Sequence, residues 1–174
     1  HYTFDGTLED SGPGGNHGTF FGGDPVFVEG HDGTPQGAIL LDGVDDYVDL
    51  TYTNGLPISS YPAFSITAWV KGPVQRDKRF FAESSTTNNR PLFNLGTDNT
   101  GTTGAFDLFI RGDNNRAVAN HRKSAGIPQD TIHAGIAFDD TWHHIAYIDD
   151  NGNVTVYIDG VKDTANFSYT RTPL

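Results

Sequence analysis

The sequence predicts an all-β domain of two packed antiparallel sheets. Short runs of alternating apolar and polar residues recur between clusters of Gly, Asn, Asp and Pro, and no helical periodicity extends over about eleven residues. The chain of 174 residues contains 21 Gly, 9 Pro, 12 Phe and 7 Tyr. Because strands favour aromatic residues and tight turns favour Gly and Pro, this composition is typical of a sandwich or barrel.

The expected strands are short and follow one another along the whole chain. Each one carries β-branched or aromatic residues and is bounded by turn-forming residues. In order they are residues 1–4, 18–21, 26–28, 37–41, 47–50, 64–70, 79–83, 92–95, 106–111, 116–121, 142–148, 154–158 and 164–167. So many short strands in one domain bury their apolar faces by stacking as two sheets.

Alternation assigns faces in three of these segments. In 64–70 one face carries Phe64, Ile66, Ala68 and Val70, and the other carries Ser65, Thr67 and Trp69. In 106–111 the inward set is Phe106, Leu108 and Ile110, and the outward set is Asp107, Phe109 and Arg111. The segment 142–148 is apolar on both faces, so we expect a central strand whose second face is covered by a loop or another layer.

The last third of the chain predicts a hairpin. Asn151 and Gly152 separate the alternating segments 142–148 and 154–158. Both residue types tolerate the positive φ that a tight hairpin turn requires. Asp159 and Gly160 end the second segment in another turn.

Charge and composition exclude several classes of protein. The net charge of −11 argues against nucleic acid as a partner, because phosphate contacts need Lys and Arg. No apolar run has the length of a membrane span, and we expect no signal peptide within this segment. The absence of cysteine excludes disulfides and thiolate metal sites. The chain starts at His1 and contains no methionine, so we expect a segment of a longer or processed polypeptide.

Four sequence blocks carry a family resemblance. The first comprises Tyr-Thr-Phe-Asp-Gly at 2–6, Asp-Ser-Gly at 10–12 and Asn-His-Gly at 16–18. The second is Gly-Ala-Ile-Leu-Leu-Asp-Gly at 37–43 with Asp-Asp-Tyr-Val-Asp at 45–49. The others are Phe-Ser-Ile-Thr-Ala-Trp-Val at 64–70, and Trp-His-His-Ile-Ala at 142–146 with Tyr-Ile-Asp-Gly at 157–160. In this order they resemble laminin-G-like domains of the concanavalin A-like lectin/glucanase type, which implies one antiparallel two-sheet jelly-roll sandwich over residues 1–174.

The resemblance has one departure. Domains of this family usually continue past the Asp-Gly turn into a further strand or two that pairs beside the N-terminal strand. Here the chain stops at Leu174, soon after that turn. We therefore expect a jelly roll that lacks its last strand or strands. Residues 1–4 would then lie on an open edge that another segment or chain fills.

The resemblance also implies a structural calcium ion near the first hairpin. Asp10 and Asn16 lie in that loop, and Asp42 lies in a turn that the family arrangement places nearby. Calcium takes about six to eight oxygen ligands from flexible loops. The alternative is that these three side chains cap turns through hydrogen bonds to the backbone.

The predicted function is carbohydrate recognition by a secreted or cell-surface protein. Stacking aromatic residues with a few fixed polar groups make up such a site. The predicted carbohydrate-binding residues are Glu83, Asp107, Phe109, Arg111 and Tyr157. The same residues also suit an ordinary solvated sheet surface. The alternative function is a structural or adhesion domain that binds another protein chain.

Catalysis is not expected. Jelly-roll glycosidases resemble one another in a Glu-x-Asp-x-x-Glu strand that presents an acid and a nucleophile on one face. The three glutamates here, Glu9, Glu29 and Glu83, do not form this pattern. The neighbours His143 and His144 point to opposite faces of a strand and do not readily share one site. An accessory module of a glycan-active enzyme fits these observations.

Overall fold

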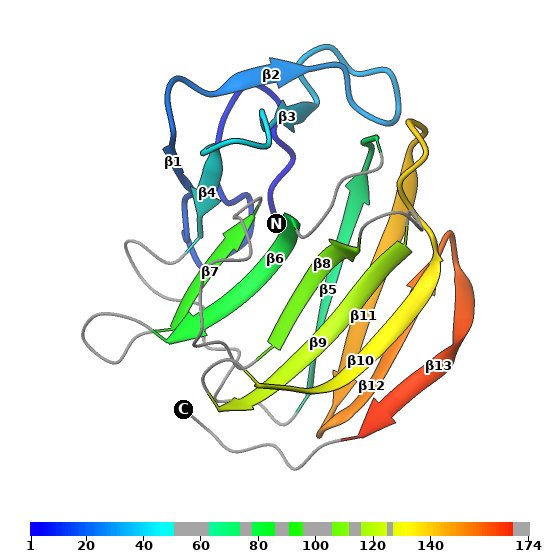
Figure 1. The fold of residues 1–174 in the computed structure, drawn as a ribbon. Coiled ribbons are helices and arrows are strands. Elements are labelled where there is room, and N and C mark those ends of the chain that lie inside the picture. Colours follow the sequence, from blue (N-terminus) through cyan, green and yellow to red (C-terminus); the bar gives the residue numbers. More distant parts are fainter. Residues whose placement is uncertain are drawn as a thin grey trace.

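Antiparallel β-strands build the fold (Figure 1). The computed structural model describes residues 1–50, 63–73, 78–85, 91–95, 106–111, 116–124 and 127–168. The strands in this part of the chain are β1 (Thr19–Phe21), β2 (Val26–Val28), β3 (Ala38–Leu40), β4 (Tyr47–Asp49), β5 (Ala63–Val70), β6 (Lys78–Ser85), β7 (Pro91–Leu95), β8 (Phe106–Arg111), β9 (Arg116–Ser124), β10 (Ile127–Ile136), β11 (His143–Asp150), β12 (Asn153–Ile158) and β13 (Val161–Ser168).

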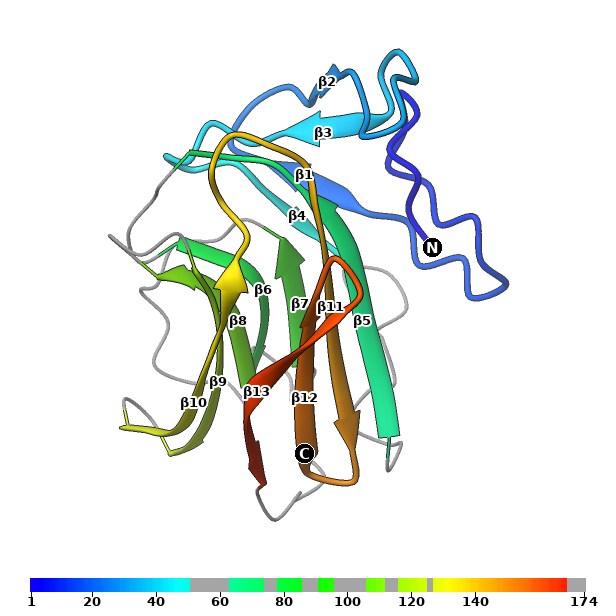
Figure 2. The same cartoon turned by 90° about the vertical axis from the view of Figure 1, so that its right-hand side faces the viewer.

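Two main sheets form the layers of a sandwich. The seven-stranded sheet has the order β1-β4-β7-β6-β8-β9-β10, and the four-stranded sheet has the order β13-β12-β11-β5. Figure 2 shows the two sheets facing one another, with the short β2–β3 sheet at one end. All strand pairs in these described segments are antiparallel. The predicted two-sheet sandwich is confirmed.

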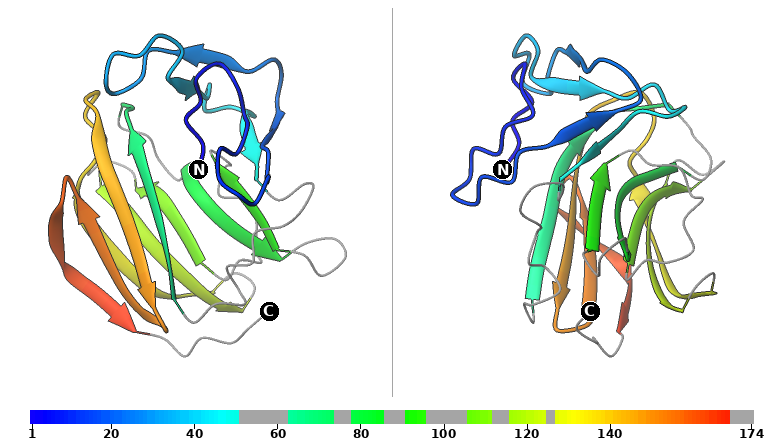
Figure 3. Two further views of the ribbon diagram at one scale, coloured as in Figure 1. Left: turned by 180° about the vertical axis from the view of Figure 1, so that it is seen from behind. Right: turned by 90° about the vertical axis from the view of Figure 1, so that its left-hand side faces the viewer.

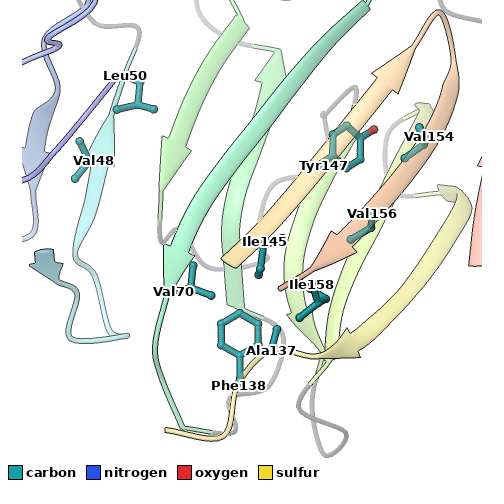
Figure 4. Close-up of a cluster of buried hydrophobic side chains, with 10 residues drawn as sticks. All are labelled: Val48, Leu50, Val70, Ala137, Phe138, Ile145, Tyr147, Val154, Val156 and Ile158. Atoms are coloured by element: carbon teal, nitrogen blue, oxygen red, sulfur yellow. The ribbon is translucent and has the colours of Figure 1, made fainter. Parts of the chain in front are cut away.

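The hydrophobic core lies between these layers (Figure 4). Alternate residues of the four-stranded sheet supply most of its described part, among them Ile145 and Tyr147 of β11 and Val154 and Val156 of β12. In β5, Phe64, Ile66 and Ala68 pack against the core, while Ser65, Thr67 and Trp69 are exposed. The predicted faces of this strand are therefore confirmed.

Two tight turns shape the four-stranded sheet. Asn151 and Gly152 join β11 to β12 with φ values of 51° and 85°. Asp159 and Gly160 join β12 to β13 with φ values of 51° and 77°. The carboxylate of buried Asp149 accepts a hydrogen bond from the Gly152 amide at 2.7 Å. Both turns were predicted, and β11 is central in its sheet as expected.

Residues 1–4 do not form the predicted strand. Tyr2 makes a single antiparallel bridge to Asp10, and Phe4 has a φ of 54°. That left-handed conformation ends any extended run, and the Gly6 amide then bonds to the carbonyl oxygens of Phe4 and Gln36 at 2.9 and 3.0 Å. The segment is a loop that precedes β1 (Figure 3).

Strand β10 was missing from the prediction. Residues 127–136 show no clean alternation and include Pro128, which weakens the strand signal. The structure places β10 at the edge of the seven-stranded sheet, where a residue without an amide hydrogen is tolerated. Register shifts interrupt its pairing with β9. β10 also lies beside β13, so it brings the edges of the two sheets together.

Candidate functional site

The outer face of the four-stranded sheet carries an exposed cluster of aromatic rings. Trp69 is 46% exposed, and the imidazole of His31 stacks on its indole with ring centroids 4.2 Å apart and planes inclined by 15°. His144, which pairs with Trp69 across β5 and β11, lies at 5.2 Å and is tilted by 58°. Trp142 meets the His31 ring edge-on at 6.3 Å. The His31 ring covers one face of the indole, and nearly half of the Trp69 surface stays exposed as an apolar surface for a ligand.

The β2–β3 connection positions His31. The Gly30 amide donates to the Thr34 carbonyl oxygen at 2.9 Å, and the Asp32 carboxylate accepts from the Thr34 amide at 3.0 Å. The hydrogen bond from the Thr34 amide, and then one from the Thr34 side chain, lower the pKa of Asp32 because they favour its charged form. A Cβ at Gly30 would lie 2.9 Å from the carbonyl oxygen of Gly37, so the loop closes tightly at its base. Figure 1 shows the loop next to the ends of β5 and β11.

His143 fixes the start of β11, and with it His144. Its Nδ1 lies 2.7 Å from Asp159 Oδ2, and its Nε2 lies 3.0 Å from Asp139 Oδ1. The other oxygen of Asp159 accepts from the His144 amide at 2.8 Å. The hydrogen bond to Asp159 and then that to Asp139 raise the pKa of His143, while partial burial opposes the shift. His143 therefore ties together three neighbouring segments.

Tyr157 extends the outer face away from this cluster. It lies between the buried Val156 and Ile158 on β12, so it faces outward and is partly exposed. Its cross-strand neighbours are Ala146 on β11 and Lys162 on β13. Tyr157 therefore lies between a small apolar side chain on one strand and an amine on the other.

An exposed acidic cluster that could bind a metal lies in the β3–β4 loop. Oxygen atoms of Asp42, Asp45 and Asp46 lie within 4.8 Å of one another. Asp42 Oδ1 also accepts the Val44 amide at 2.8 Å, so this carboxylate caps its own turn. The cluster contains one of the three predicted calcium ligands, Asp42.

The other two predicted ligands lie together in the loop before β1. Asp10 Oδ2 accepts the Asn16 amide at 3.0 Å, and Asp10 Oδ1 accepts the Gly12 amide at 2.8 Å and the His1 amino group at 2.6 Å. The His1 amino group first, and then the two amides, lower the pKa of Asp10 to about 2. The Tyr2 hydroxyl donates to the Asn16 carbonyl oxygen. Both oxygens of Asp10 thus serve to hold the loop.

The predicted carbohydrate-binding residues lie on two different sheets. Glu83 on β6 and Asp107, Phe109 and Arg111 on β8 belong to the seven-stranded sheet, and Tyr157 belongs to the four-stranded sheet. The register pairs Asp107 with Ala82 and pairs Glu83 with Phe93 of β7. The five positions therefore do not make up one sheet face. Burial and side-chain contacts of the four on β6 and β8 lie outside the described part of the structure.

Trp69 and His31 were not among the predicted site residues. Alternation along 64–70 placed Trp69 on the face opposite Phe64, Ile66 and Val70, and a large aromatic residue on that face was the available signal. The contact with His31 joins distant parts of the chain, and no local pattern indicates it.

Two stacked antiparallel sheets without a helix in the described residues define a lectin-like β-sandwich. A sequence profile described as the Concanavalin A-like lectin/glucanases superfamily matches residues 42–174. The chain therefore belongs to this superfamily, as its sequence blocks predicted. No match was found among curated proteins.

One solved structure is similar over nearly the whole chain. It is Domain 4 of AbnA, a GH43 extracellular arabinanase from Geobacillus stearothermophilus, in complex with arabinotriose. The TM-score is 0.62 with 23% sequence identity, and the match covers 99% of this chain and 74% of the other. At this identity the likeness establishes a shared fold. In the described part of the chain, no helix has the length and apolarity of a membrane span.

Proposed function

We propose that this domain is a non-catalytic carbohydrate-binding module. The exposed indole of Trp69, supported by His31 and His144, is the observation that carries the proposal. Sugar rings present apolar C–H faces that stack on aromatic rings, and nearby polar groups fix their orientation. Membership of a superfamily of lectins and glucanases supports this function, as does a similar domain that was solved with arabinotriose.

Two surfaces compete as the site of binding. The outer face of the four-stranded sheet offers Trp69 and Tyr157. The seven-stranded sheet offers the predicted residues Glu83, Asp107, Phe109 and Arg111. We favour the first surface, because the exposure and ring contacts of Trp69 supply the stacking platform that a sugar needs.

The absence of catalysis is part of the proposal. None of the three glutamates in the sequence lies in the paired pattern of jelly-roll glycosidases. The charged pairs around His143 hold strand ends together. An accessory module of a glycan-active enzyme, acting outside the cell or at its surface, fits this picture.

Calcium is the cation we propose for the acidic cluster. The carboxylates of Asp42, Asp45 and Asp46 are hard oxygen ligands on a loop, which suit calcium. The ligand set Asp10, Asn16 and Asp42 remains a prediction. We expect millimolar calcium to raise the melting temperature of the chain and the variant Asp45→Asn to lose most of that rise. Equal shifts in both proteins, or no shift, would contradict calcium binding at Asp45.

A second function, adhesion through another protein chain, is favoured by one observation. Val26 and Leu40 pair across the β2–β3 sheet, and each is about half exposed. Exposed aliphatic residues side by side suit a protein contact.

A glycan array of the purified chain separates the two functions. Saturable binding to a defined sugar, weakened by Trp69→Ala, supports carbohydrate recognition. If no glycan binds and a partner chain is instead released by Leu40→Asp, adhesion is the function.

A further inference from the structure

Trp69 and Tyr157 lie on the same outer face with one strand between them. Trp69 on β5 pairs with His144, and Tyr157 on β12 pairs with Ala146, so β11 separates the two aromatic residues. Both alternate with core residues: Trp69 precedes buried Val70, and Tyr157 follows buried Val156. The two rings therefore border one continuous surface.

The separation of the two residues is set by the geometry of the sheet. They lie two strands apart and are offset by two residues along the strand direction. With a strand spacing of about 4.8 Å and a rise of about 3.3 Å per residue, their Cα atoms lie about 12 Å apart. A single sugar ring is too small to contact both residues at once. A ligand that uses both must be a chain of linked sugars.

The surface between them suits such a chain. Ala146 lies at its centre, and its small side chain leaves a low floor between Trp69 and Tyr157. On one side, the exposed residue Thr67 of β5 pairs with Ala146 and offers a hydroxyl group. On the other side, exposed Lys162 of β13 pairs with Tyr157. A low apolar floor with polar groups at its sides can accept a linear chain without a deep pocket.

The charge of the protein selects among linear glycans. A net charge of −11 disfavours a polyanionic ligand by repulsion. The cation Lys162 lies at the end of this surface, next to Tyr157, and not between the two aromatic residues. The hydroxyl of Thr67, at the other side of this surface, carries no charge.

We propose that the outer face of the four-stranded sheet binds a linear, neutral oligosaccharide across β5, β11 and β12. Trp69 stacks on one sugar ring, Tyr157 stacks on a second, and the linking part of the chain crosses Ala146. This inference rests on the proposed carbohydrate-binding function and specifies the ligand as an extended chain.

Calorimetric titration with sugars of increasing length tests the proposal. The probes are the series from arabinose to arabinohexaose, matching xylose and glucose series, and oligogalacturonides as charged counterparts. In the wild-type chain, affinity should rise by about tenfold or more once an oligomer reaches both aromatic residues. Tyr157→Ala should abolish this rise and leave the binding of the shortest ligands unchanged, whereas Trp69→Ala should weaken all lengths.

Two variants serve as controls. Tyr157→Phe keeps the ring and should keep the rise with length. Val44→Ala removes an exposed apolar side chain from the β3–β4 loop and should bind as the wild type does. Circular dichroism and melting curves establish that each variant is folded before it is titrated.

Three results would overturn the proposal while leaving carbohydrate binding intact. They are an affinity that does not depend on chain length, a length dependence that survives Tyr157→Ala in the folded protein, and tighter binding of oligogalacturonides than of the neutral series. No binding of any glycan, by contrast, would overturn the proposed function itself.

Discussion

The two faces of the four-stranded sheet are built by the same strands, but their side chains differ in burial and in what they contact. On the inner face, Ile145, Tyr147 and Val156 are almost completely buried and belong to one hydrophobic cluster. On the outer face, Trp69 keeps nearly half of its surface exposed beside His144. The inner side chains are removed from water when the protein folds. The outer side chains stay hydrated in the folded protein and can be removed from water when a ligand binds.

This difference indicates that alternate residues of one strand serve different roles: those on the inner face stabilise the fold, and those on the outer face are available for recognition. Neighbouring residues such as Trp69 and Val70 serve opposite purposes because successive side chains of a strand point to opposite faces. Inner substitutions should unfold the domain, and outer substitutions should affect binding. The following variants test how complete the separation is.

Ile145→Ala should have the largest effect. Its side chain is 1% exposed, so truncation leaves a cavity and should lower the free energy of unfolding by about 2 to 5 kcal/mol. Urea denaturation measures the change. The matched outer variant Thr67→Ala, on an exposed residue of the adjacent strand, should stay within about 0.5 kcal/mol of the wild type. Equal losses of unfolding free energy in the two variants would contradict the difference between the inner and outer faces.

Trp69→Ala should weaken glycan binding strongly and lower the stability of the fold only slightly. We expect Kd for the preferred glycan to rise roughly 30-fold, which corresponds to about 2 kcal/mol lost at a central aromatic contact. Stability should fall by about 1 kcal/mol, because only the ring contacts with His31 and His144 are lost. Titration calorimetry and thermal melting of the same sample measure both. A loss of stability as large as that of Ile145→Ala would contradict the separation.

Gly152→Ala should destabilise the hairpin that carries both faces. Gly152 has a φ of 85°, which costs an L-residue with a Cβ about 1 to 2 kcal/mol. Chemical denaturation provides the measurement. Gly23→Ala is the matched control, because a Cβ there meets no atom within 4 Å and no positive φ is required. The turn explanation fails if both variants behave alike.

His143→Gln should lower the free energy of unfolding by a smaller amount, and this amount should depend on pH. The carboxylates of Asp159 and Asp139 raise the pKa of His143, so the protonated ring stabilises the fold fully below its ordinary pKa of 6.5 and loses this effect as the pH rises through the raised value. The pKa values of Asp139 and Asp159 are lowered, so their contribution is present above 3.8 and is lost as the pH falls.

The difference in stability between wild type and His143→Gln should therefore be largest near pH 5. Both carboxylate partners are nearly half exposed, so solvent screening keeps the loss of stability smaller than that of the other variants. Denaturation at pH 5 and at pH 9 measures it. A difference that grows towards pH 9 would contradict the assigned ion pairs.

Much of the fold could be predicted from the sequence where local chemistry and the tertiary structure agree. Asn151-Gly152 forms the expected turn because few other residues accept its conformation. The faces of β5 follow directly from alternation. Strand β10 escaped prediction because its position at an edge removes the need for a clean pattern, and the segment at 1–4 contains a turn at Phe4 that its alternation concealed.

The candidate site was less predictable for a physical reason. Tyr157 was among the predicted residues, but the exposed ring cluster on its sheet face contains Trp69 and His31, which were not. His31 reaches Trp69 through a turn held by Gly30 and Thr34. Such a contact depends on how distant segments pack. The acidic residues showed the same limit: Asp42 gathers with Asp45 and Asp46 of its own loop, and Asp10 bonds within another.

The central claim is that recognition takes place on the outer face of the four-stranded sheet. The most direct test is to compare the affinities of folded Trp69→Ala and Arg111→Ala for the tightest-binding glycan. These residues lie on different sheets. We predict a rise in Kd of roughly 30-fold for Trp69→Ala and a change of less than about threefold for Arg111→Ala. The opposite ranking would contradict the account and move the site to the seven-stranded sheet.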